Sequence, residues 1–129
     1  MTDFDGVAFL GVSDILLGAV SRAPASISDD NQALIRSSIS RSYYAAYLVA
    51  RTKLTLLGYV QPTRGHQDHG IVGRALAGRS AILGHDLDRL RAKRNQADYN
   101  LNPSGITLTA GRHWRDLARQ VIDGINVLT

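Results

Sequence analysis

The chain has 129 residues and no cysteine, which excludes a disulfide framework and any thiolate metal site. A chain of this length can bury a core without cross-links, and we expect one domain over residues 1–129. Fifteen basic against eleven acidic residues give a net charge of +4, which slightly favours anionic partners. The acidic N-terminal residues and short apolar runs predict neither a signal peptide nor a membrane span, so we expect a cytoplasmic protein.

The first predicted helix covers about residues 5–22. Its apolar residues recur at helical spacing and predict a buried face. This stripe contains Phe9, Val12, Leu16 and Val20, with Ala8 and Ile15 beside it. Three glycines lower the helix propensity of the segment. A connector with Pro24 follows, and Ser28 or Asp29 is expected to cap the next helix.

The second predicted helix, about residues 31–57 and ended by Gly58, is the clearest element. A continuous apolar stripe predicts its core face: Ile35, Ile39, Tyr43, Ala46, Ala50, Leu54 and Leu57. A second row runs beside it: Arg36, Ser40, Tyr44, Tyr47 and Arg51. Tyrosines placed in this way usually bury their rings and keep the hydroxyl at an edge, so packing is favoured over chemistry for this row.

The rest of the chain alternates loops and helices. A loop with Pro62 precedes a short helix near residues 67–77, and Ser80 is expected to cap a long helix that continues to Tyr99. A break over residues 100–105 precedes a last helix that begins near Thr107 or Thr109. The inward residues are expected to be Ile71, Val72, Ala75, Leu76, Leu83, Leu87, Leu90, Ala97, Trp114, Leu117, Val121, Ile125 and Leu128. The fold prediction is all-α: an antiparallel four-helix up-and-down bundle with one extra short helix.

One face of the fourth predicted helix gathers charge. Arg91, Arg94, Asn95 and Asp98 are three or four residues apart and therefore neighbours on a helix. The arginines could bind a phosphate while the carboxylate holds them in place. An ordinary solvated helix face with an Arg94–Asp98 ion pair explains the same pattern.

Most enzyme signatures are missing from the sequence: it has no phosphate-binding glycine loop and no nucleophile elbow. His66 and His69 could share a helix face, but two histidines without a third ligand are weak evidence for a metal. The sequence therefore indicates no cofactor and no metal. His85 and His113 are expected to be exposed or hydrogen-bonded.

Two motifs resemble those of one protein family. The run from Ser40 to Tyr47, S-R-S-Y-Y-A-A-Y, resembles the second-helix signature S-R-x-Y-Y-A-x-F of the HEPN superfamily. The run from Arg94 to Tyr99 resembles the R-x-x-A-D-Y element of the same family. The short helix led by His69 is also similar to one that these proteins carry between the motifs. The resemblance covers nearly the whole chain.

The resemblance implies a small helical bundle, commonly a homodimer. Catalytic HEPN proteins are metal-independent ribonucleases with an R-x(4–6)-H motif, whose arginine and histidine from two protomers surround one scissile phosphate. Arg94 matches that arginine, and Asn95 matches the polar residue that often follows it. At the position of the histidine this chain has Tyr99.

This departure matters because RNA cleavage by 2′-hydroxyl attack needs a base, an acid and positive charge at the phosphate. Histidine exchanges protons near neutral pH, whereas tyrosine normally keeps its proton. Tyr99 could donate a proton or orient the phosphate, and Arg94 could clamp it. Asp98 could hold an arginine, or act as a base if its environment favoured the protonated form. We therefore expect Arg94, Asp98 and Tyr99 as catalytic residues, although an ion pair and a packed ring would explain the last two equally well.

The substrate-binding residues are expected to be Arg91, Asn95, Ser40 and Tyr44. If the rows of Arg94 and Tyr44 meet across a two-fold axis, like charges converge, and Asp98 of each protomer would neutralise them. This predicts a dimer that tightens around phosphate.

Two functions of different class remain open at this point. The first is an RNA-binding or RNA-cleaving HEPN protein, the toxin of a pair whose antitoxin is a small nucleotidyltransferase. The second is a non-catalytic HEPN module that binds a partner protein or nucleotide, favoured by the absent histidine. An unrelated bundle with a metal or small-molecule site is a third interpretation.

Overall fold

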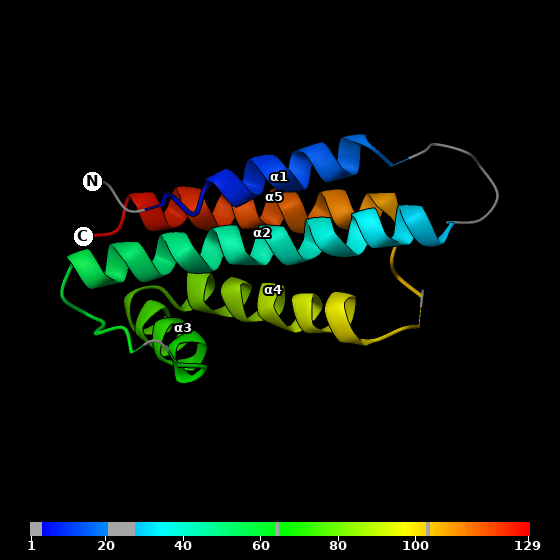
Figure 1. Cartoon of the computed structure of the whole chain (residues 1–129). Coiled ribbons are helices and arrows are strands. Elements are labelled where there is room, and N and C mark those ends of the chain that lie inside the picture. Colours follow the sequence, from blue (N-terminus) through cyan, green and yellow to red (C-terminus); the bar gives the residue numbers. More distant parts are fainter. Residues whose placement is uncertain (1–3, 21–27, 64, 103) are drawn as a thin grey trace.

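The computed structural model describes residues 4–20, 28–63, 65–102 and 104–129, and all regular structure in these ranges is helical. The predicted all-α class is therefore confirmed. The helices are α1 (Ala8–Gly18), α2 (Asp29–Leu56), α3 (Gln67–Arg79), α4 (Ala81–Tyr99) and α5 (Leu108–Asn126). Four of them lie side by side, and α3 runs across their direction at one end (Figure 1).

Helix α2 is the centre of the bundle and contacts each of the other four helices. Its predicted core stripe is confirmed from Ile35 to Leu54, and Leu57 is half-buried just after the helix. Tyr43 is the largest fully buried side chain of the described residues. The packing of this face against four helices, rather than intrinsic propensity, stabilises the long helix.

Capping residues define where three helices begin. The backbone N–H of Asn31 donates to Ser28 Oγ at 3.2 Å, and the N–H of Leu83 donates to Ser80 Oγ at the same distance. Thr107 caps α5 in the same way. Each such bond satisfies an N–H group that has no partner within its helix. The predicted caps Ser28 and Ser80 are confirmed, and Gly58, with a φ of 83°, follows the end of α2.

The buried face of α1 agrees only in part with the predicted stripe: Val20 is buried just after the helix, and Phe9 and Leu16 are half-buried. Val12 and Ile15 are 40% and 72% exposed, while the helix buries Leu10, Ser13 and Leu17. Apolar residues surround α1 on nearly all sides, so their spacing alone did not single out one face. The helix is also shorter than expected, and residues 21–27, which include the end of the predicted helix and Pro24, lie outside the described residues.

A buried hydroxyl cluster explains why α1 turns a serine toward the core. Ser13 Oγ lies 2.6 Å from Ser38 Oγ and 2.8 Å from Ser42 Oγ, both on α2. Ser38 Oγ also donates to the Ser13 carbonyl at 3.3 Å. All three side chains are fully buried, so these bonds satisfy groups that water cannot reach. The cluster fixes how α1 is rotated against α2.

Helices α3 and α4 form a tight pair joined through Ser80 alone. A Cβ added at Gly84 would lie 2.5 Å from Ala77 Cα, so the two helices approach at a position where only glycine fits. Of the residues expected inward on the last three helices, eight are buried: Val72, Leu76, Leu87, Leu90, Ala97, Leu117, Val121 and Ile125. Five are half-buried: Ile71, Ala75, Leu83, Trp114 and Leu128.

In the described ranges, no helix combines the length and apolarity that crossing a membrane requires.

Candidate functional site

A hollow of about 220 Å³ lies where the start of α3, the middle of α2 and the second half of α4 meet. Its lining residues are Tyr43, Tyr44, His66, His69, Arg91, Arg94, Asn95 and Tyr99. Of the seven residues expected at the site from the sequence, all but Ser40 and Asp98 line this hollow. Residues from three helices that are distant in sequence thus meet around one space.

The Arg94 guanidinium is fixed on one side by an acidic side chain. Its Nε lies 2.8 Å from Asp98 Oδ2, and Ser40 Oγ donates to the same oxygen at 3.3 Å. The Nε hydrogen is not aligned with a hydrogen-bond acceptor, so the contact with Asp98 is an ion pair. The predicted pairing of Arg94 with Asp98 is therefore present, and Ser40 acts on Asp98 rather than facing the hollow.

Aromatic rings hold the other side of the Arg94 guanidinium. Its central carbon lies 5.1 Å from the ring centre of Tyr44 and 5.5 Å from that of Tyr99. Both distances suit cation–π attraction. Nη1 also donates to Asn95 Oδ1 at 3.1 Å. These contacts restrict the long side chain before any ligand arrives, which reduces the entropy lost on binding.

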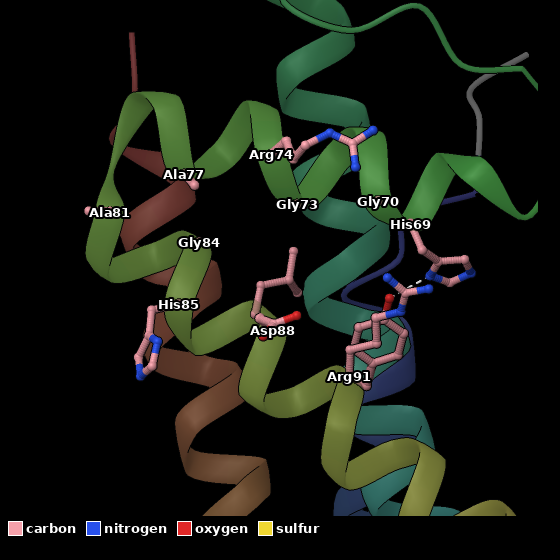
Figure 2. A pocket seen from close by; sticks show the side chains of 12 residues that line it. His69, Gly70, Gly73, Arg74, Ala77, Ala81, Gly84, His85, Asp88 and Arg91 are labelled. Atoms are coloured by element: carbon pink, nitrogen blue, oxygen red, sulfur yellow. Dashed lines mark hydrogen bonds between the residues drawn. The ribbon is translucent and has the colours of Figure 1, made fainter.

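Arg91, one turn earlier on α4, is less constrained. Within the described ranges it makes no hydrogen bond and no ion pair, although it lines the hollow and is only half-exposed. In Figure 2 its side chain extends from α4 toward His69 on α3. The hollow therefore contains one arginine, Arg91, that no acid in the described structure neutralises, and a second, Arg94, that forms an ion pair with Asp98.

His69 is the residue that sequence reasoning did not assign to the site. Its ring stacks on that of Tyr47, with centroids 4.2 Å apart. Its Nδ1 is hydrogen-bonded to the Tyr43 hydroxyl, the bond drawn as a dashed line in Figure 2. Burial lowers the pKa of His69, and the positive charges of Arg91 and Arg94 lower it further. The imidazole is therefore neutral at neutral pH and can take up a proton.

Burial also raises the pKa of Tyr43, so its phenol keeps the proton at neutral pH. The hydrogen bond to Tyr43 holds Nδ1 of His69 in place, and in the tautomer whose Nδ1–H donates to the Tyr43 oxygen the lone pair of Nε2 is free to accept a proton. His69 precedes Arg94 in the sequence and lies on a different helix, so only the packing of α3 against α4 brings it close to Arg94. The only sequence signal was its place at the start of the short third helix.

The second row of α2 supports this site along its whole length. Each member contacts α3, α4 or the segment that follows α4. The pairs are Arg36 with the Ala97 and Asn100 carbonyls, Ser40 with Asp98, Tyr44 with Arg94, Tyr47 with His69, and Arg51 with Asp68. Packing was the favoured interpretation of this row, and the structure shows that Tyr44 and Tyr47 pack against residues of the hollow while the other three members contact residues beside it.

The described residues contain no cluster of three or more side chains that could ligate a metal. His66 and His69 both line the hollow, but Nδ1 of His69 already has Tyr43 as its partner. His85 and His113 are exposed, in agreement with the expectation from sequence.

Comparisons of the chain with protein-family models, curated proteins and solved structures give no match. The resemblance to the HEPN superfamily therefore rests on the two sequence motifs.

Proposed function

We propose that this chain is a HEPN-type protein that binds RNA by holding a backbone phosphate in the hollow between Arg91 and Arg94. The observation that carries the proposal is the convergence of these two arginines, one unpaired and one fixed by Asp98, beside a neutral histidine. A guanidinium offers several N–H donors in a planar fork that matches phosphate oxygens. The alternating directions of α1, α2, α4 and α5 support the related proposal of an antiparallel four-helix up-and-down bundle (Figure 1).

Cleavage without a metal would use the same groups. His69 would accept the proton of the ribose 2′-hydroxyl, whose oxygen attacks phosphorus while the bond to the 5′ oxygen breaks. The leaving oxygen would take the Tyr99 phenol proton, and Arg91 and Arg94 would stabilise the charge on the phosphoryl oxygens. The products are a 2′,3′-cyclic phosphate and a 5′-hydroxyl. His69 would thus take the part of the histidine that is absent after Arg94.

The resemblance adds two partners to the proposal: a second copy of the chain and a nucleotidyltransferase antitoxin. In the structure the rows of Arg94 and Tyr44 already meet within one chain, and Asp98 pairs with Arg94 there. A dimer would therefore bring together two hollows that are each already formed.

The second candidate is a non-catalytic module that binds a nucleotide or a partner protein. The Asp98 ion pair favours it, because this carboxylate offsets part of the positive charge that a transition state would use. Phosphate binding through Arg91 is common to both candidates.

An RNA-binding and cleavage assay in EDTA tests the proposal. Single-stranded RNA is titrated in fluorescence anisotropy, and the products are resolved on a gel, for wild type, Arg94→Ala and His69→Gln. Arg112→Ala, an exposed arginine of α5 outside the hollow, is the matched control. Loss of one charged hydrogen-bonding group is expected to weaken binding by about 10-fold or more in Arg94→Ala and not in the control.

The outcomes separate the candidates. His69→Gln is expected to bind RNA but not cleave it. Arg94-dependent binding without cleavage by folded wild type would favour the non-catalytic module. Equal binding by wild type and Arg94→Ala would overturn the assignment of the hollow.

A further inference from the structure

A second cavity adjoins the hollow. It is a groove of about 470 Å³ between α3 and α4, and it shares Tyr43, His69 and Arg91 with the hollow. The groove runs from these residues toward the α3–α4 turn, as Figure 2 shows. A molecule that places a phosphate beside Arg91 could therefore extend directly into it.

Two glycines of α3 and one leucine of α4 form part of the lining of the groove. On α3 it is lined by Gly70 and Gly73, and a Cβ added at Gly73 would meet no atom within 4 Å. Leu87 of α4, only 3% exposed, adds an apolar surface. The Arg74 guanidinium covers Gly70, with its Nη1 3.1 Å from where a Gly70 Cβ would lie, so the open backbone is at Gly73. The open backbone at Gly73 and the aliphatic side chain of Leu87 leave a slot suited to a flat ring.

One acid lies in this groove. Asp88 is exposed, lines the groove one turn before Arg91, and makes no hydrogen bond or ion pair with any residue that the structure describes. In Figure 2 it lies on α4 between His85 and Arg91. Its two oxygens are acceptors without a partner among the residues that the structure describes.

We propose that the α3–α4 groove binds the base of the nucleotide whose phosphate lies in the hollow, and that Asp88 selects guanine. This inference rests on the proposed function. The Watson–Crick edge of guanine has two adjacent donors, N1–H and the N2 amino group, which can both bind one carboxylate. Each of the other three bases presents a donor next to an acceptor, and that acceptor is repelled by the second carboxylate oxygen.

The spacing along α4 fits one nucleotide. Asp88 and Arg91 are separated by about 4.5 Å of helix rise, and Asp88 and Arg94 by about 9 Å. A base near Asp88 and a phosphate between Arg91 and Arg94 therefore lie about as far apart as the two ends of one mononucleotide. RNA and a free guanine nucleotide share this chemistry, and the experiment below distinguishes the two sources.

Calorimetric titration with 5′-GMP, 5′-AMP, 5′-CMP and 5′-UMP tests the inference, with short single-stranded RNAs that contain or lack guanine as a second arm. Wild type is expected to favour guanine by about 10-fold, and Asp88→Asn to lose most of that preference. Asp123→Asn, an exposed acid of α5 outside the groove, is the matched control and keeps the preference. Tighter binding of guanine-containing RNA than of 5′-GMP identifies RNA as the source.

A second pair of variants tests the groove itself. Gly73→Leu fills the slot, whereas Gly78→Leu places the same side chain on α3 outside the groove, and neither Cβ meets an atom within 4 Å. Gly73→Leu is expected to lose base preference but still bind inorganic phosphate, and Gly78→Leu to behave as wild type.

The experiments distinguish failure of this inference from failure of the proposed function. Nucleotide binding that depends on Arg94 but shows no preference for guanine overturns this inference and leaves the proposed function standing. A guanine preference that survives both Asp88→Asn and Gly73→Leu overturns the inference as well. If neither nucleotides nor RNA bind, both proposals fail.

Discussion

Replacing Arg36 by alanine should loosen the end of α4 on which the hollow depends. Nη1 of Arg36 donates to the carbonyls of Ala97, at 2.9 Å, and Asn100, at 2.6 Å, while Nη2 donates to that of Asn102, at 3.2 Å. Nε is held by Gln32 Oε1 at 3.1 Å. The last carbonyls of a helix have no partner within it, so one side chain of α2 satisfies the end of α4.

The magnitude follows from these bonds. A buried hydrogen bond to a charged group contributes about 1.5–3 kcal/mol, but water can replace these partly exposed bonds, so we take about 0.5 kcal/mol for each of the three bonds to carbonyls. The positive charge near the negative end of the helix dipole adds about 0.5 kcal/mol. Arg36→Ala should therefore lower the free energy of unfolding by about 2 kcal/mol, or the Tm by about 8 °C.

Urea denaturation followed by circular dichroism measures this change, with Arg112→Ala as control. Arg36→Lys keeps the charge but loses the fork that reaches three carbonyls, so it should fall between alanine and wild type. The last turn of α4 also contains Asp98, so Arg36→Ala should weaken phosphate binding as well. An Arg36→Ala protein as stable as Arg112→Ala would refute the reasoning.

Four further substitutions test the packing and the titration of the protein. Ser13→Ala should lower the free energy of unfolding by about 1–2 kcal/mol, because it leaves two buried hydroxyls of α2 short of a partner, and urea melts would show it. Gly84→Ala should lower the free energy of unfolding by about 1–3 kcal/mol, since its Cβ would meet the backbone of α3. Gly73→Ala has open space around the new Cβ and should raise the free energy of unfolding by up to about 1 kcal/mol. The two variants should therefore shift the Tm in opposite directions. Burial and the nearby arginines lower the pKa of His69 below its ordinary value of 6.5, so the unfolded chain binds a proton that the folded chain disfavours. The stability that the folded protein owes to a neutral His69 is fully present above pH 6.5 and is lost as the pH falls toward the lowered pKa. The Tm should therefore decline less steeply with falling pH in His69→Gln than in wild type.

Much of the secondary structure followed from local physical chemistry. Caps at Ser28 and Ser80 and the long stripe of α2 are short-range signals, because N-cap bonds and 3.6-residue periodicity involve neighbours along the chain. The same reasoning placed Arg94 beside Asp98, since residues four apart meet on any helix. It did not distinguish the buried face of α1, where apolar residues lie on nearly all sides and three serine hydroxyls decide the rotation.

Only the tertiary structure decided the composition of the hollow. His69 reaches it from α3 and Tyr44 from α2, and no spacing along the chain encodes their distance from Arg94. The groove beside it depends on the close approach of Gly84 to Ala77, which sets how α3 and α4 diverge. The sequence by itself thus determined the helices and the pairs within them. The contacts between helices, which depend on how the core packs, determined which side chains surround the candidate site.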